Sequence, residues 1–232
     1  MPDKKGIFTK ETFVFFRDLE RNNRKEWMHE NRDRYEDFVV APFRRLLEQL
    51  TPAVHKLNPA FDTCGRTGRN FSRINRDIRF ARDKSPYRAQ MYLMFSEPAP
   101  KGSEAGQFYV GVTSAVVTAG FRIFGERKKG ALAEVARPRA CENSRWLAAQ
   151  AKKLGRAYES YWHLTEKKEW NKREGWPLTS DEWEKLQAWI VRKKMKPAAA
   201  TKADFVGMVE KVFKDLIPLW RMTSARDWKA GT

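Results

Sequence analysis

The chain has 232 residues, of which 41% are hydrophobic and 13% aromatic, enough to bury one sizeable core. Its net charge of +17 favours acidic partners such as nucleic acid or phosphorylated metabolites, although a generally basic proteome would also give such an excess. Two cysteines exclude a disulfide framework, and no run approaches the roughly 18 apolar residues of a membrane span. We expect one globular, cytoplasmic domain over residues 1–222, with a loose tail at 223–232.

Residues 9–57 have a helical pattern of hydrophobic residues. Thr9 is a candidate N-cap, and Phe13, Phe16 and Leu19 recur on one side of the helix that it begins. A longer pattern follows from residue 24 and is interrupted by Pro42 and Pro52, which kink a helix or begin a new one. The segment is therefore predicted to form two or three helices.

The period changes to alternation between residues 70 and 124. Residues 72–80 and 91–95 alternate as two strands, with a proline-containing turn at 83–87 between them. Residues 108–113 and 116–124 have the composition of a second pair of strands. A mostly antiparallel sheet is predicted for the middle of the chain.

Residues 128–220 are predicted to return to helices. Tyr158, Tyr161 and Trp162 are assigned to one helix, and a capping box at 179–182 begins another with Trp183 and Trp189 on its inner face. The last helix has an apolar stripe from residue 205 to 220 and is expected to stop at the proline at position 218. The fold class is therefore α+β, with N-terminal and C-terminal helices flanking the sheet.

Positive charge is concentrated after the first quarter of the chain. Residues 1–63 carry 12 Lys or Arg against 11 Asp or Glu, whereas residues 64–232 carry 34 against 18. Residues 66–88 alone hold seven arginines and one lysine against Asp77 and Asp83. Like charges this close repel one another unless acids or an anionic ligand lie among them. The segment is the first place to look for a binding site.

Two sequence elements together resemble a known family. Asn22-Asn-Arg-Lys-Glu-Trp27, with Tyr35 behind it, is similar to an Asn-Asn-x-x-x-Trp element. Residues 73–87, which read R-I-N-R-D-I-R-F-A-R-D-K-S-P-Y, are similar to a second element that ends in Asp-Lys-Ser-Pro-Tyr. Both are typical of the bacterial and fungal family called domain of unknown function 2461. The resemblance is specific over residues 9–95 and implies one intracellular domain with no established activity.

The leading hypothesis for residues 73–87 is a site for phosphate groups, on nucleic acid or on a phosphorylated small molecule. Arginine binds phosphate with planar, bidentate geometry, and the Ser-Pro-Tyr turn adds hydroxyls and a ring. On a strand, alternate residues from 73 to 79 would face a ligand while Ile74, Ile78 and Phe80 pack. The predicted ligand-binding residues are Arg73, Arg76, Arg79, Arg82, Lys84, Ser85 and Tyr87.

Two alternatives are kept for the same residues. In the first, the protein is a phosphoester hydrolase or transferase with Asp77 or Asp83 as metal ligand or general base. In the second, both aspartates are buried ion-pair partners of the arginines and of Lys84, and the motif is purely structural. Whether the protein is an enzyme is left open at this point.

Other motifs carry less weight. Gly65-Arg-Thr-Gly68 spells a GxxG loop but precedes a predicted strand, so a simple hinge is favoured. Glu126-Arg-Lys128 resembles half of a metal-dependent nuclease site, but the same spelling recurs elsewhere in the chain. The three histidines lack metal-ligand spacing, so no metal site and no cofactor are predicted. Trp170 and Trp176 lie in a polar stretch and are candidate stacking platforms.

Overall fold

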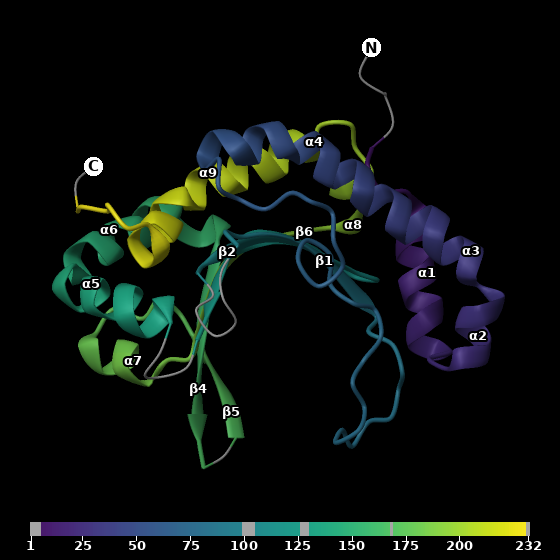
Figure 1. Ribbon diagram of the computed structural model, residues 1–232, viewed down its shortest axis with the longest axis horizontal. Helices are drawn as coiled ribbons and strands as arrows, with labels where there is room; N and C mark the ends of the chain where they lie inside the picture. Colours follow the sequence, from purple (N-terminus) through teal and green to yellow (C-terminus); the bar gives the residue numbers. More distant parts are fainter. Residues whose placement is uncertain (1–5, 99–104, 126–129, 168, 231–232) are drawn as a thin grey trace. The chain divides into compact units, whose positions relative to one another are not determined.

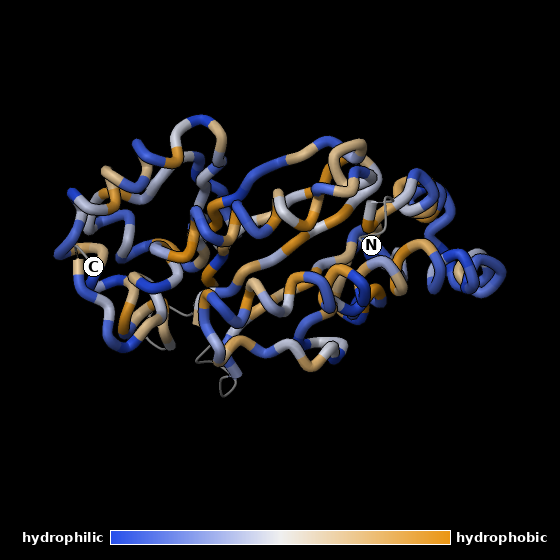
Figure 2. The backbone as a smooth tube through the Cα atoms, turned by 90° about the horizontal axis from the view of Figure 1, so that it is seen from above, coloured by the Kyte–Doolittle hydropathy of each residue, from blue (hydrophilic) through white to orange (hydrophobic). Residues whose placement is uncertain are grey.

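The computed structural model describes residues 6–98, 105–125, 130–167 and 169–230 (Figure 1). The backbone divides into two compact units. Unit 1 comprises Met1–Phe95, Val110–Thr118 and Lys194–Glu210, and unit 2 comprises Ser96–Tyr109, Ala119–Lys193 and Lys211–Thr232. Along the helical parts of the backbone, hydrophobic and hydrophilic residues alternate, as expected for helices with one buried side (Figure 2).

The predicted N-terminal helices of unit 1 are confirmed. They are α1 (Lys10–Arg21), α2 (Lys25–Glu30), α3 (Arg32–Tyr35), a π-helix η1 (Glu36–Val40) and α4 (Ala41–Leu57). Thr9 is the N-cap of α1, and Pro42 lies in the first turn of α4, where its missing N–H is not needed. Pro52 lies inside α4, which continues past it to Leu57.

Aromatic rings make the core of unit 1. Phe8 packs edge-on against Phe43 of α4 at 5.2 Å and against Phe205 at 5.8 Å, measured between ring centroids. Phe15 of α1 contacts the rings of Trp27 at 5.6 Å and Tyr35 at 5.8 Å. The second cluster therefore joins α1, α2 and α3, and it fixes the position of Tyr35.

The sheet has the order β1-β2-β3-β6-β4-β5. Its strands are β1 (Gln90–Phe95), β2 (Gln107–Thr113), β3 (Val117–Phe124), β4 (Glu159–Glu166), β5 (Glu169–Glu174) and β6 (Ala188–Met195). β4 pairs antiparallel with both of its neighbours. The predicted α+β fold with an antiparallel sheet is confirmed.

The strand predicted over residues 72–80 is wrong. This stretch has an irregular backbone with isolated bridges that join Phe71 to Leu93 and Asn75 to Tyr87. Asp77 accepts a hydrogen bond from the backbone N–H of Arg79 at 3.3 Å, two residues along the chain. Such local side-chain bonds compete with strand pairing, so the alternating pattern does not produce an extended strand here.

The prediction that residues 128–220 are helical is correct only in part. The helices are η2 (Leu132–Ala136), α5 (Arg137–Glu142), α6 (Ser144–Leu154), η3 (Gly155–Ala157), α7 (Ser180–Lys185), α8 (Pro197–Ala200) and α9 (Phe205–Ser224), but three strands lie among them. Tyr161 and Trp162 belong to β4, and Trp189 belongs to β6. Trp189 donates from Nε1 to the hydroxyl of Ser160 at 2.9 Å, so a tertiary contact outweighs the local pattern.

The last helix does not stop at its proline. Pro218 lies inside α9, which runs to Ser224. Arg139 donates to the carbonyl groups of Met222 at 3.1 Å and Ala225 at 2.6 Å. A guanidinium at this end satisfies carbonyls that have no partner within the helix, so the chain just after α9 is fastened to α5.

The border between the two units falls inside elements of secondary structure. It divides β2 after Tyr109, β3 after Thr118, β6 after Lys193 and α9 after Glu210. That the chain behaves as one domain stays a prediction.

Candidate functional site

A single asparagine side chain joins the two family-like sequence elements. Asn23, just after α1, donates from Nδ2 to the carbonyl of Tyr87 at 2.9 Å. The backbone N–H of Tyr87 donates back to Oδ1 of Asn23 at 3.0 Å. The amide thus pairs with the backbone as a neighbouring strand would, which holds the Ser-Pro-Tyr turn against the N-terminal helices.

A second asparagine fixes the start of the basic segment. Asn70 is 1% exposed. Its Nδ2 donates to the carbonyl groups of Asp62 at 2.7 Å and Met94 at 3.0 Å, and its Oδ1 accepts from the N–H of Gly65 at 2.9 Å. Gly65 has a φ of 72° and Gly68 one of 87°, backbone conformations that glycine adopts without strain.

Residues 76–86 form a closed loop, called the 76–86 loop below. Arg76 donates its backbone N–H to the carbonyl of Pro86 at 2.8 Å. Its guanidinium binds the carboxylate of Asp83 and also donates to the carbonyl of Ser85 at 3.2 Å. Figure 1 shows the loop reaching away from β1 and α4. Both ends of the loop are therefore tied by one arginine.

The aspartates of the motif are both engaged within this loop. Arg79 donates from Nε to Asp77 Oδ1 at 2.9 Å and from Nη2 to Asp77 Oδ2 at 2.7 Å, which is a bidentate pair. The Arg79 hydrogen bonds hold the pKa of the Asp77 carboxyl below its usual range. Hydrogen bonds from Ser85, and then the guanidinium of Arg76, hold the pKa of Asp83 well below its usual range. Both carboxylates are exposed, ionised and weakly basic.

The predicted ligand-binding residues therefore separate into two sets. Arg76 and Arg79 are paired with acids, Lys84 donates to the carbonyl of Ile78 at 3.1 Å, and the backbones of Ser85 and Tyr87 hold the loop. The other cations of the motif form no ion pair with a carboxylate in the described ranges. They are Arg73 and Arg82 of the predicted set, together with Arg88.

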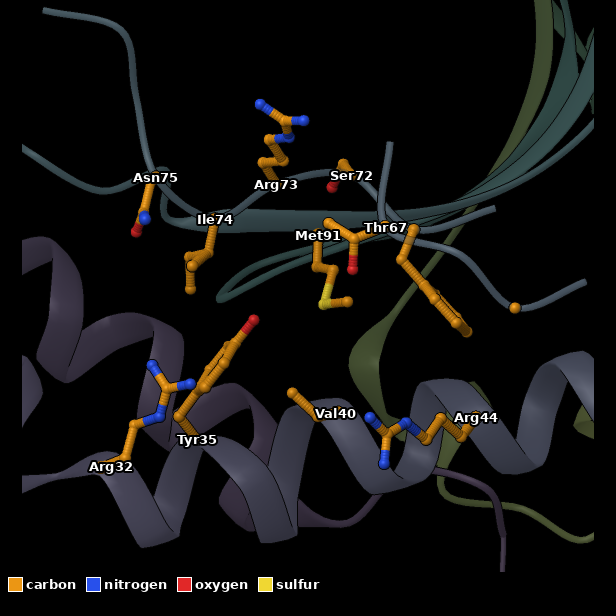
Figure 3. Close-up of a pocket in the computed structure, with 12 residues that line it drawn as sticks. Arg32, Tyr35, Val40, Arg44, Thr67, Ser72, Arg73, Ile74, Asn75 and Met91 are labelled. Carbon is orange, nitrogen blue, oxygen red and sulfur yellow. The ribbon is translucent and has the colours of Figure 1, made fainter. Parts of the chain in front are cut away.

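A pocket of about 410 Å³ lies between the helices α3 to α4 and the start of the basic segment, and we call it the Tyr35 pocket. Figure 3 shows Arg32 and Arg44 on the helix side, with Tyr35 and Val40 between them. On the opposite side Ile74 and Met91 point toward the helices, whereas the side chain of Arg73 points away from them. All of these residues belong to unit 1.

The charge of the Tyr35 pocket is carried by arginines. Arg32 pairs with Glu36 at 3.0 Å and lies over the ring of Tyr35, 5.3 Å from its centroid. Arg44 has no carboxylate within ion-pair distance among the residues that the structure describes. Burial, and then Glu36, raise the pKa of Tyr35, so its hydroxyl is a neutral hydrogen-bond donor. In Figure 3 this hydroxyl points away from the helices toward the basic segment.

A second pocket of about 430 Å³ lies beside the closed end of the 76–86 loop. Its charged lining consists of Arg76, Asp83, Arg88 and Glu20. Arg76 and Asp83 form an ion pair, and the other two charged lining residues, Glu20 and Arg88, have charges of opposite sign. This pocket is therefore less cationic than the Tyr35 pocket and is a poorer phosphate site.

Sequence reasoning missed Arg32 and Arg44 as site residues and used Tyr35 only for the family resemblance. The signal was present in their spacing, because residues 32, 36, 40 and 44 are four apart and share one helix face. The basic segment, which faces them across the pocket, lies some 30 residues further along the chain, so no local sequence pattern indicates that the two meet.

The remaining sequence candidates are dispersed. Trp170 is 53% exposed and stacks on His163 at 5.1 Å, whereas Trp176 is half-buried against Trp189. Glu126-Arg-Lys128 lies outside the described residues. Across the described ranges, no three His, Cys, Asp or Glu side chains form a group able to hold a metal ion. In the same ranges, no helix has the length and apolar character needed to cross a bilayer.

Comparison with protein-family models gives a match over most of the chain. A family model described as "Conserved hypothetical protein (DUF2461)" matches residues 11–222, nearly the whole chain. A search of curated proteins finds no matching relative.

Proposed function

The chain belongs to the conserved hypothetical protein family DUF2461, whose description names no activity, and from its site we propose that it binds phosphate-bearing anions. One observation carries the proposal. After Asp77 and Asp83 are paired with Arg79 and Arg76, cations without a carboxylate partner in the described ranges remain on both sides of the basic segment. They include Arg44, Arg73, Arg82 and Arg88.

The Tyr35 pocket is the best place for one phosphate group. Arg44 offers a guanidinium with no competing acid, and Arg32 offers donors beyond those used on Glu36. The Tyr35 hydroxyl adds a neutral donor on a ring that is held by the aromatic cluster. Thr67 and Ser72 line the opposite wall with hydroxyls. Because the Tyr35 ring is already held in place, its hydroxyl loses little side-chain entropy on binding.

Hydrolysis through Asp77 or Asp83 is less favoured than binding. A general base must be able to accept a proton, and the lowered pKa of each carboxyl opposes this. Asp77 lines neither pocket, and Asp83 lines the less cationic one. The purely structural alternative describes Arg76 and Arg79 well, but it leaves Arg44 and Arg73 without a role.

The proposed setting is the cytoplasm, where phosphorylated metabolites and nucleic acids are abundant. Both cysteines, Cys64 and Cys141, are free thiols, as expected for a reducing compartment. Membrane attachment plays no part in the proposal.

Titration with tripolyphosphate over a range of NaCl concentrations tests the proposal. We expect the logarithm of the binding constant to fall linearly with the logarithm of salt concentration, because bound cations are released from the ligand. Arg44→Gln should weaken binding about tenfold, since one charge-assisted hydrogen bond contributes roughly 1.5 kcal/mol. Arg17→Gln, an exposed arginine of α1, is the matched control and should leave affinity unchanged. No binding to tripolyphosphate or to an oligonucleotide at low salt would contradict the proposal.

A further inference from the structure

The 76–86 loop carries the most exposed large hydrophobic side chain in the described part of the molecule. Phe80 is 95% exposed, whereas the other exposed large hydrophobic residues are Phe124 at 40%, Trp170 at 53% and Leu178 at 38%. Partly exposed apolar side chains are ordinary at protein surfaces. A phenylalanine that is almost wholly in solvent gains nothing from the hydrophobic effect within its own chain.

The loop that presents Phe80 is braced from inside. The N–H of Ala81 donates to the carbonyl of Ile78 at 3.3 Å, and the ammonium of Lys84 donates to the same carbonyl at 3.1 Å. Arg76 closes the base of the loop through Asp83 and Ser85, as described above. Hydrogen bonds and an ion pair within the loop therefore hold the backbone that presents Phe80.

The surroundings of Phe80 are cationic. Residues 76–84 contain four cations, Arg76, Arg79, Arg82 and Lys84, against two aspartates. The guanidinium of Arg79 lies 5.9 Å from the centroid of the Phe80 ring. Arg82 has no carboxylate partner in the described ranges. A bare aromatic ring beside cations is the combination with which proteins hold unpaired bases and their phosphates.

The position of Phe80 favours an extended ligand over a small one. Phe80 lines neither the Tyr35 pocket nor the second pocket. A phosphorylated metabolite that fills the Tyr35 pocket would therefore leave the ring untouched. A polymer with a phosphate at every repeat can occupy the pocket and also reach the loop.

We propose that the ligand is single-stranded nucleic acid and that one of its bases stacks on Phe80, an inference that rests on the proposed function. Arg82 binds a phosphate beside the stacked base, and Arg73 and Arg44 bind phosphates further along the strand. A single strand fits better than a duplex, because its bases are available without the cost of unstacking a base step. An anionic membrane is a weaker occupant, because one ring gives too little apolar area for stable anchoring.

An oligonucleotide that contains 2-aminopurine tests the stacking directly, because its fluorescence is quenched when the base stacks. With the full-length protein we expect quenching, and we expect Phe80→Ala to abolish it and to weaken binding about tenfold. Phe80→Trp should keep both the quenching and the affinity, and Phe80→Leu should lose both, since leucine is apolar but not planar. Phe124→Ala is the matched control with an exposed ring elsewhere, and it should behave as the parent protein. Because Phe80 is 95% exposed, these variants should unfold at the parent temperature.

Parallel titrations with tripolyphosphate and with anionic vesicles separate the possible outcomes. If tripolyphosphate binds and depends on Arg44, but the oligonucleotide binds equally well without Phe80, the stacking inference is overturned and the proposed function stands. If leucine substitutes fully for Phe80, or if vesicles are bound in preference to the oligonucleotide, stacking is also overturned. If neither phosphate ligand binds, the proposed function and this inference fail together.

Discussion

The 76–86 loop and the Tyr35 pocket contain the same kind of side chain in opposite circumstances. In the loop, Arg76 and Arg79 each bind an aspartate that lies two to seven residues away along the chain. In the pocket, Arg44 lies across from the basic segment and has no carboxylate partner in the described ranges. The comparison separates arginines that shape the backbone from arginines that remain available to a ligand.

The net charge alone does not distinguish the arginines of the loop from those of the pocket. The loop contributes cations to the total of +17, yet much of its charge is neutralised in place by Asp77 and Asp83. The pocket contributes fewer cations, but they face a cavity with hydroxyl groups. Whether a cation is paired therefore matters more for function than how many cations lie nearby.

Removal of the buried Asn70 side chain should have the largest effect on stability. Asn70→Ala would leave the carbonyl groups of Asp62 and Met94 and the N–H of Gly65 without their partner. Because each unsatisfied buried group costs about 1–3 kcal/mol, we expect a loss of roughly 3 kcal/mol or more in the free energy of unfolding. Denaturation with urea measures the loss. Asn75→Ala, exposed in the same segment, is the control and should change it by less than about 0.5 kcal/mol.

Release of the loop from the helices should have a smaller and more local effect. Asn23→Ala removes two hydrogen bonds to the backbone of Tyr87, at 2.9 and 3.0 Å. The site is partly open to water, so we expect a loss of about 1–2 kcal/mol. Amide hydrogen exchange should become faster in residues 76–88 while α4 keeps its protection. Uniformly faster exchange would show that Asn23 supports the whole unit rather than the loop.

The ion pair at the base of the loop should give the smallest effect, with a defined pH dependence. The pKa of Asp83 is lower in the folded protein than its ordinary value of 3.8, so ionised Asp83 favours the folded state. This stabilisation is present above pH 3.8 and is lost as the pH falls toward the folded pKa. Asp83→Asn should therefore be slightly less stable than the parent at pH 7, and the two should converge in acid.

The control for this pair is Asp227→Asn, because Asp227 is exposed and forms no ion pair in the described ranges. Its difference from the parent should not depend on pH in the same way. If the stability of Asp83→Asn equals that of the parent at every pH, the salt bridge contributes nothing and the loop is held by backbone bonds alone.

Sequence patterns predicted the fold where periodicity was strong and local. The stripe of α9 and the apolar positions of α1 and α4 are regular, because each faces a core along its length. β4 and β6 were missed because their aromatic residues sit at spacings that also suit a helix. The deciding contact, from Trp189 to Ser160, joins residues 29 positions apart.

The sequence indicated where the candidate site lies but not which of its side chains are open to a ligand. Charge density pointed to residues 66–88, and this segment forms one wall of the Tyr35 pocket. The sequence offered pairing of the aspartates with the arginines only as an alternative, and it did not show that Asp77 pairs with Arg79, which removes both residues from the set open to a ligand. It also did not bring Arg32 and Arg44 into view, because folding places those helix residues opposite the segment.

Isothermal titration of tripolyphosphate into Arg44→Gln and Arg79→Gln compares the two regions most directly, since each variant removes one positive charge. We predict that Arg44→Gln weakens binding about tenfold, whereas Arg79→Gln, whose charge is already paired with Asp77, changes it by less than about twofold. Equal losses in the two variants, or a larger loss for Arg79→Gln, would contradict it.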